Sequence, residues 1–152
     1  MPQHNNTQMN DLLKSFCVGY EKKNLDEATL RWAIQTGLSS IAFDYSHINQ
    51  NDDISAYNSL AANNLTAKFW HQTQVNLTKQ IISALNEQGI VPTLLKGISI
   101  STSCYPKPHY RTMRDIDILV AVTEVDKVEE ILPRLGYEQR STYSKEFYES
   151  LH

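Results

Sequence analysis

The stretch that decides the fold covers residues 91–120 and reads VPTLLKGISISTSCYPKPHYRTMRDIDILV. Near its end, Asp115 and Asp117 stand one residue apart in an otherwise apolar segment. Side chains at positions i and i+2 of a strand point to the same face, so we expect the two carboxylates on one side and Ile116 and Ile118 on the other. Burying charge is costly without a compensating partner, so this pair requires an explanation.

One explanation for Asp115 and Asp117 is a divalent cation. Mg²⁺ prefers oxygen ligands, takes only a few of them from protein, and completes its shell with water and phosphate oxygens. The alternative is that the acids face solvent or pair with Arg111 and Arg114. The two-residue spacing alone favours that alternative. The choice between a metal site and a solvent-facing or arginine-paired couple of acids therefore depends on the residues upstream.

Upstream, Lys96 and Gly97 stand at an expected junction between a strand over residues 90–95 and a helix over residues 98–105. A glycine at such a junction permits close approach of the backbone, and the start of a helix presents free N–H groups to anions. Lys96 adds a positive charge beside that turn. An ordinary tight turn is the alternative interpretation of these two residues alone.

Further groups around this junction are suited to phosphate. Ser99 and Ser101 offer hydroxyl donors, and Arg111 and Arg114 precede the acids in positions to hold a triphosphate tail or a leaving pyrophosphate. In this order along the chain, the residues predict a phosphate held between backbone N–H groups and a metal ion.

This arrangement resembles the nucleotidyltransferase superfamily of the DNA polymerase β type, in which a glycine-serine turn and a helix precede a strand with two acids. A closer similarity is to a bacterial nucleotidyltransferase family with the pattern L-K-G, a short helix ending near a tyrosine, then R-x-x-x-D-I-D-L-L-V. The matching positions are 95–97, Tyr105 and 111–120, and LGY follows at 135–137. The resemblance covers roughly residues 25–140, and residues 94–120 are its most specific part.

The resemblance implies an α+β fold with an α/β-like core. A helical region over residues 1–88 would precede an incomplete, small polymerase-β-type nucleotidyltransferase sheet with helices over residues 89–152. It also implies a metal-dependent nucleotidyltransferase that moves a nucleoside monophosphate from an NTP to a hydroxyl of a small molecule, a protein or RNA by a two-metal mechanism.

The resemblance also assigns roles to individual residues. Asp115 and Asp117 would be the catalytic ligands of two divalent ions, Mg²⁺ or Mn²⁺. The nucleotide phosphates would be bound by five further residues: Lys96, Gly97, Ser99, Arg111 and Arg114.

The chain departs from the family pattern in two respects. Lys96-Gly97-Ile98-Ser99 replaces the usual glycine-serine pair, and a third carboxylate on a later strand has no evident counterpart. After Tyr137 the acids are Glu138, Glu146 and Glu149, each expected at the surface. We therefore expect either the N-terminal part of a longer protein or a naturally shortened form, and two alternatives stay open. These are a catalytically incomplete module that binds nucleotide or a protein partner, and a helical interaction module whose α/β part is structural.

Composition and short motifs narrow the classes of protein to which the chain can belong. The net charge of the 152 residues is −3, so no general basic surface for nucleic acid is expected. Cys17 and Cys104 match no metal-ligand spacing and are expected to be reduced, buried or half-buried thiols. No apolar run is long enough to cross a membrane, and the first ten residues lack the features of a secretion signal, so a cytoplasmic protein is expected. A kinase or a hydrolase is not expected, because the sequence contains neither a P-loop pattern nor a nucleophilic Ser/His or Cys/His arrangement.

The remaining elements follow from hydrophobic periodicity and from helix caps. Asn24 with Glu27 predicts a capping box, and Phe69 and Trp70 are interpreted as core contacts. Pro133 is expected to kink or tighten the last helix before Gly136 ends it. The expected helices cover 25–36, 38–48 and 124–135, and residues 54–88 are expected to form one long helix or two helices end to end. The later strands are expected over 115–122 and 137–149.

Overall fold

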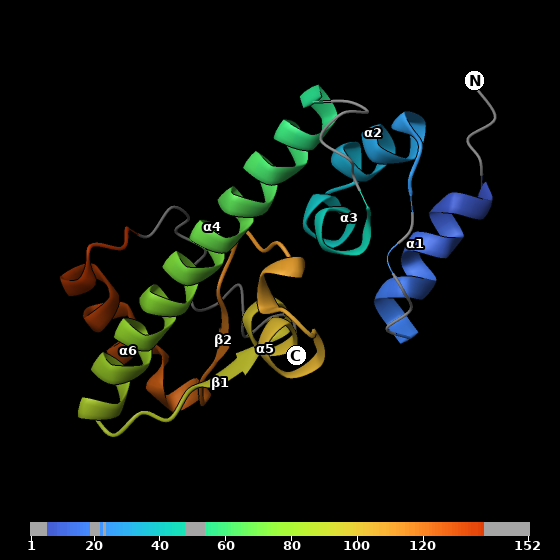
Figure 1. The fold of residues 1–152 in the computed structure, drawn as a ribbon. Coiled ribbons are helices and arrows are strands. Elements are labelled where there is room, and N and C mark those ends of the chain that lie inside the picture. The colour runs from blue at the N-terminus through green and yellow to red at the C-terminus, as the bar shows by residue number, and fades with distance from the viewer. Residues whose placement is uncertain (1–5, 19–21, 23, 48–53, 139–152) are drawn as a thin grey trace, which may run out of the picture. The chain divides into compact units, whose positions relative to one another are not determined.

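The computed structural model of the chain describes residues 6–18, 22, 24–47 and 54–138. Over these residues the fold is α+β, as predicted, with helices and a two-stranded antiparallel sheet (Figure 1). The α-helices are α1 (Asn6–Val18), α2 (Glu27–Gln35), α3 (Ser39–Tyr45), α4 (Ile54–Glu87), α5 (Lys96–Cys104) and α6 (Val125–Ile131). The strands are β1 (Thr93–Leu95) and β2 (Asp117–Leu119), and the 3₁₀ helices are η1 (Pro108–Tyr110), η2 (Val122–Glu124) and η3 (Leu132–Leu135).

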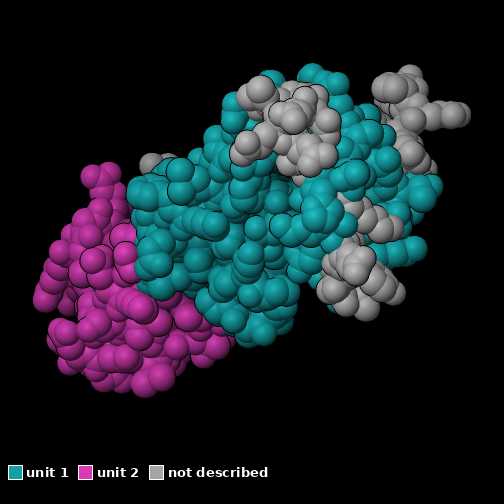
Figure 2. Space-filling view, in the orientation of Figure 1, with its two compact units in different colours: residues 1–75, 95–117 teal, residues 76–94, 118–152 magenta. Residues whose placement is uncertain are grey.

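The chain divides into two compact units, which Figure 2 distinguishes by colour. Unit 1 comprises residues 1–75 and 95–117, and unit 2 comprises residues 76–94 and 118–152. These units are groupings of contacts, and the expected domain division between residues 88 and 89 stays a prediction.

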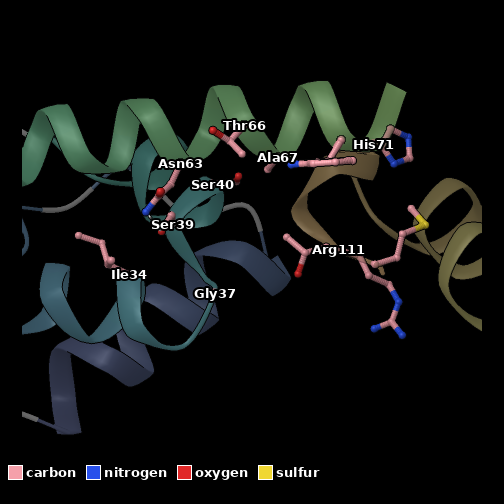
Figure 3. A pocket seen from close by; sticks show the side chains of 12 residues that line it. Ile34, Gly37, Ser39, Ser40, Asn63, Thr66, Ala67, His71 and Arg111 are labelled. Carbon is pink, nitrogen blue, oxygen red and sulfur yellow. Dashed lines mark hydrogen bonds between the residues drawn. The ribbon is translucent and has the colours of Figure 1, made fainter. Parts of the chain in front are cut away.

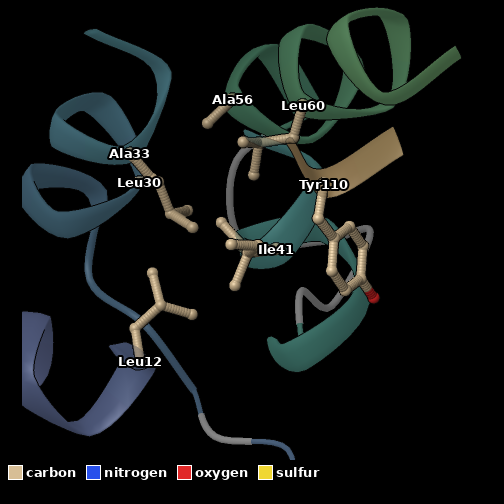
Figure 4. Close-up of a cluster of buried hydrophobic side chains, with 8 residues drawn as sticks. Leu12, Leu30, Ala33, Ile41, Ala56, Leu60 and Tyr110 are labelled. Atoms are coloured by element: carbon tan, nitrogen blue, oxygen red, sulfur yellow. The ribbon is translucent and has the colours of Figure 1, made fainter. Parts of the chain in front are cut away.

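The core of unit 1 lies among α1, α2, α3 and the first part of α4. Leu60 of α4 and Leu12 of α1 are completely or almost completely buried, and Tyr110 of η1 joins them (Figure 4). Truncating a buried leucine to alanine in such a core costs about 2–5 kcal/mol. The other members of the cluster are Leu30, Ala33, Ile41, Ala42 and Ala56.

The start of α2 differs from the predicted capping box. Asp26, not Asn24, is the N-cap, and its Oδ1 accepts the backbone N–H of Thr29 at 2.8 Å. An aspartate directly before the first helical residue satisfies one of the free N–H groups of the first turn, which Asn24 is two residues too early to reach.

The long helix α4 confirms the prediction of a helix over residues 54–88. In unit 1 its buried positions, Ala56, Leu60 and Asn64, are four residues apart and therefore share one face. The interpretation of Phe69 and Trp70 as core contacts is wrong, because these side chains are 65% and 56% exposed. They lie off the face that Leu60 defines.

Unit 2 contains a shorter strand and a tighter helix end than the sequence suggested. The expected strand over 115–122 is reduced to β2, because the chain turns into η2 where Glu124 accepts the N–H of Ala121 at 3.3 Å. Pro133 tightens the end of α6 into η3, as expected, and Gly136 ends it with φ of 87°. The buried apolar residues of this unit are Ile81, Leu85, Ile90, Val128 and Ile131.

Two remaining expectations concern the surface. Cys17 and Cys104 are free thiols, as expected, but both are exposed rather than buried. Within the described ranges, no helix combines the length and the apolar character needed to cross a membrane. The last strand expected from the sequence lies almost entirely outside the described residues.

Candidate functional site

The turn between β1 and α5 has an unusual backbone conformation. Lys96, the first residue of α5, has φ of 46°. In the part of the chain that the structure describes, it is the one residue other than glycine with a positive φ. A left-handed conformation costs a residue with a Cβ about 1–2 kcal/mol. Strain of this kind persists where the surrounding structure over-determines the conformation, which is common at functional sites.

Gly97 is required by space rather than by backbone conformation. A Cβ built on Gly97 would lie 3.1 Å from the Cβ of Met113 and 3.9 Å from the carbonyl oxygen of Asp115. The segment that leads into β2 therefore packs directly against the turn. This contact places the turn beside the two acids, which the sequence could suggest only from the order of the residues.

The lysine of the turn pairs with one of the acids. Lys96 Nζ lies 3.2 Å from Asp117 Oδ1, and the two side chains are 71% and 27% exposed. Asp115 is exposed and precedes β2 instead of lying within it. The alternative in which Arg111 and Arg114 neutralise the acids is wrong for Asp117, because Lys96 is its partner.

A cavity of about 360 Å³, the charged pocket, brings most of the predicted site residues together. Its wall carries three cations and two acids. Ser99 does not belong to this wall, and Ser101 is buried with its hydroxyl donating to the carbonyl of Ile98 at 2.9 Å. The lining residues are Lys96, Gly97, Arg111, Thr112, Met113, Arg114, Asp115 and Asp117.

The two arginines of the charged pocket form no ion pair with any residue that the structure describes. Within the described ranges, neither Arg111 nor Arg114 has a carboxylate partner, and the Nε of half-buried Arg111 has no hydrogen-bond partner. The carbonyl of Arg114 accepts a long hydrogen bond from the side-chain amide of Gln74 at 3.5 Å. Both guanidinium groups are thus available to an anionic ligand.

The segment that carries Arg111 is held by a polar contact to α3. Tyr110 donates its hydroxyl to Asp44, and Lys107 Nζ lies 2.7 Å from the same carboxylate. Burial raises the pKa of Asp44, but these two hydrogen bonds and the charge of Lys107 lower it by more, so the pKa lies below its ordinary value. Burial and the bond to Asp44 raise the pKa of Tyr110, which keeps it a neutral donor.

A second cavity of about 290 Å³, the α4 pocket, shares Arg111, Thr112 and Met113 with the charged pocket. Asn63 on α4 donates through Nδ2 to the hydroxyl of Ser39 on α3 at 3.2 Å. Figure 3 shows side chains of α4 along one wall of this cavity and Arg111 coming from another segment. The other lining residues are Ile34, Gly37, Ser40, Thr66, Ala67, Trp70 and His71.

The acids of the charged pocket suit a divalent cation that shares its shell with a ligand. Two carboxylates together with phosphate oxygens are a donor set that Mg²⁺ accepts. Within the ranges described, no group of three or more His, Cys, Asp or Glu side chains is arranged so that it could hold a metal ion. Glu138 is exposed, as expected, and Glu146 and Glu149 lie outside the described residues.

Sequence reasoning missed the lining of the α4 pocket, although a signal for it was present. Asn63, Thr66, Ala67 and Trp70 recur at i, i+3, i+4 and i+7, the spacing of one helix face. That stripe lies beside the buried face of α4, and it combines polar, small and aromatic side chains. The contact of Asp44 with residues more than sixty positions later has no comparable sequence signal.

One comparison with known proteins assigns the chain to a family. A family model described as uncharacterised nucleotidyltransferase matches residues 23–151. No curated protein and no solved structure matches the chain. The matched range includes the whole charged pocket and the whole α4 pocket.

Proposed function

The chain belongs to the uncharacterised nucleotidyltransferases, and from that premise we propose that it transfers a nucleoside monophosphate from an NTP to a hydroxyl acceptor with the help of a divalent cation. The observation that carries this proposal is the charged pocket. A strained turn, two acids and three cations line one cavity, although they come from segments about twenty residues apart.

The cations of the charged pocket bind the triphosphate in this proposal. Arg111 and Arg114 are free of carboxylate partners within the described residues, and a guanidinium group matches phosphate oxygens in a bidentate geometry. Lys96 is mostly exposed, and an exposed ion pair stabilises by only about 0–1 kcal/mol. The Lys96 ammonium can therefore leave Asp117 for a phosphate at little cost.

Asp115 and Asp117 would hold the divalent cation, Mg²⁺ or Mn²⁺. When bound, such an ion neutralises phosphate charge and assists loss of the acceptor proton. The two carboxylates stand two positions apart in one chain segment and line the same cavity as the turn, so a cation that they held would be close to the bound phosphates. Ser99, which does not line the pocket, has no role in this proposal.

The reaction balances without another reactant. The acceptor oxygen attacks the α-phosphorus in line with the bridging oxygen to the β-phosphate. The bond to that bridging oxygen breaks, pyrophosphate leaves, and the acceptor proton goes to water or to the exposed Asp115 carboxylate. Positioning and charge neutralisation supply most of the catalysis in such a transfer.

A thermal-shift experiment tests the binding part of this proposal. With Mg²⁺ and NTP at a hundred times the Kd, binding stabilises the folded state by about 2.7 kcal/mol. In a domain of this size that raises the Tm by roughly 5–10 °C. Asp117→Asn should abolish the shift, whereas Glu138→Gln, a change of an exposed acid outside both pockets, should preserve it. Equal shifts in the two variants, or none in the wild-type protein, would contradict the proposal.

The transfer itself requires a second measurement. α-Labelled NTP should pass its label to an acceptor in a cell extract or to the protein itself, and Asp115→Asn should prevent this. A second candidate function, nucleotide binding without transfer, is favoured because only two acids of the described residues line the charged pocket. A preserved thermal shift with no labelled product from any extract would establish that second function.

A further inference from the structure

We infer that the α4 pocket binds the nucleoside part of the nucleotide whose phosphates occupy the charged pocket. This inference rests on the proposed function, because it assigns a place to the base and sugar of the same ligand. It gives the helical half of the chain a direct part in substrate recognition. Four observations carry it: shared lining residues, size, an aromatic face, and uncharged hydrogen-bonding groups.

The first observation is the set of shared lining residues. Arg111, Thr112 and Met113 belong to both cavities, so the cavities are neighbours along this segment. Arg111 is also the one described residue with a formal charge in the wall of the α4 pocket. A ligand with an anionic end at Arg111 and an uncharged end beyond it matches this distribution, and a nucleotide is such a ligand.

Size and shape limit the occupant to a small molecule. A volume of about 290 Å³ lies at the lower limit of typical small-molecule pockets. This volume suits a nucleoside, whereas a folded protein partner requires a far larger surface. The helices α3 and α4 supply most of the wall, so the cavity is formed before any ligand arrives.

Trp70 supplies an aromatic face for the base. Its side chain lines the α4 pocket and is 56% exposed, an unusual degree of exposure for a tryptophan. Stacking of a base on an aromatic side chain strengthens binding about 5- to 150-fold. The neighbouring Phe69 is even more exposed but does not line the pocket, so exposure alone does not define the face.

The polar groups of the α4 pocket can donate to and accept from an uncharged base or ribose. The Asn63 amide nitrogen donates to the Ser39 hydroxyl, and its amide oxygen offers a ligand an acceptor. The Nδ1 atom of His71 is buried and has no hydrogen-bond partner within the described ranges. Burial lowers the pKa of His71, so its ring is neutral near pH 7. Among the described residues, no acid or lysine lines the cavity, which disfavours a polyamine or aminosugar as the occupant.

A comparison of the affinities for tripolyphosphate and for complete NTPs tests this inference. Calorimetry with Mg²⁺ would compare tripolyphosphate with ATP, GTP, CTP and UTP on the full chain. At least one NTP should bind five-fold or more tightly than tripolyphosphate. Trp70→Ala should remove this advantage and leave tripolyphosphate binding unchanged. Leu65→Ala is the matched control, because Leu65 is an exposed apolar residue of α4 outside the pocket. The Leu65→Ala variant should change neither the affinity for the NTP nor the affinity for tripolyphosphate.

A spectroscopic measurement gives an independent readout. The chain has two tryptophans, so Trp32→Phe leaves Trp70 as the reporter. The preferred NTP should quench its emission, and tripolyphosphate should not. Asn63→Ala should weaken the NTP two-fold or more with tripolyphosphate unaffected.

The outcomes separate the two proposals. If tripolyphosphate binds but every NTP binds equally well with Trp70 unquenched, the inference on the α4 pocket is overturned and the proposed function stands. If neither tripolyphosphate nor any NTP binds, both are overturned. A selective NTP advantage that survives Trp70→Ala also overturns the inference, because the base then lies elsewhere.

Discussion

Two turns of this chain use glycine for opposite reasons. At the end of η3, Gly136 has φ of 87°, and a Cβ built on it would meet nothing within 4 Å. At the start of α5, Gly97 has an ordinary φ, but a Cβ would lie 3.1 Å from Met113. The left-handed residue of that second turn is its neighbour, Lys96.

The difference distinguishes a turn that only ends a helix from one that shapes a site. At Gly136, the residue without a Cβ stands where the backbone conformation requires it, so no strain remains. At the β1–α5 turn, glycine occupies the crowded position and a lysine takes the left-handed conformation. This arrangement gives up stability and gains a charged side chain beside Asp117, a trade that is typical of functional sites.

The largest expected effect comes from adding a methyl group to the crowded turn. Gly97→Ala should displace the Met113–Asp115 segment by a few tenths of an ångström, because the clash is with Met113 Cβ and not with a mobile chain end. We expect NTP affinity to fall by about 10- to 100-fold, since small misplacements at such sites are costly. The free energy of unfolding should change by less than the free energy of NTP binding, because alanine favours the helix and so offsets part of the clash.

Isothermal calorimetry measures this affinity, and a second variant provides the control. Met113→Gly removes the clashing atom, so in combination with Gly97→Ala it should recover part of the affinity. Unchanged NTP binding in Gly97→Ala would mean that neither the turn at Gly97 nor the turn at Gly136 shapes the nucleotide site.

Lys96 allows the strain to be measured separately from the charge. Lys96→Ala and Lys96→Gly both remove the ammonium, but only glycine relaxes a φ of 46°. We expect the glycine variant to unfold with a free energy about 1 kcal/mol higher than that of the alanine variant, after allowance for the greater freedom of glycine in the unfolded chain. Both should bind NTP equally weakly. Urea denaturation of the two variants gives the difference, and an alanine variant as stable as the glycine variant would remove the evidence for strain.

The helix-ending turn should respond in a simpler way. Gly136→Ala introduces strain without a clash and should cost about 1 kcal/mol, with NTP affinity unchanged. Gly136→Asn should cost less, because asparagine tolerates the left-handed region. Chemical denaturation monitored by circular dichroism measures both. A loss of NTP affinity in Gly136→Ala would contradict the conclusion that only the β1–α5 turn shapes the site.

The smallest effect concerns η1, a segment held by side chains and by neither glycine nor strain. The pKa of Asp44 is below its ordinary value of 3.8 in the folded chain, so the carboxylate contributes stability above that pH. This contribution is lost as the pH falls through the lowered pKa. The stability difference between the wild-type protein and Asp44→Asn should therefore shrink from pH 6 to pH 3. Urea titrations at several pH values measure it, and a difference that grows on acidification would contradict this assignment.

The sequence predicted elements where local chemistry decides them. The extent of α4, the end of the chain's last described helix at Gly136 and the tightening at Pro133 all follow from periodicity and backbone constraints. The position of Asp26 as a cap could also have been found, since it stands directly before the first helical residue.

Tertiary features were less accessible from the sequence. Met113 interacts with Gly97 through space, and no local pattern indicates that contact. Trp70 was assigned to the core because aromatic residues usually lie there, but on α4 it falls outside the stripe that Leu60 and Asn64 define. A cavity wall can look like an ordinary helix surface in sequence, because its polar side chains satisfy the same amphipathic pattern.

The ion pair of Lys96 with Asp117 has a practical consequence for handling the protein. The ammonium acts as a built-in counter-ion, so the acids do not depend on a dissolved metal to offset their repulsion. Chelating agents during purification should therefore leave the melting curve unchanged. The protein would then be prepared free of adventitious ions and reconstituted with one chosen cation at a time.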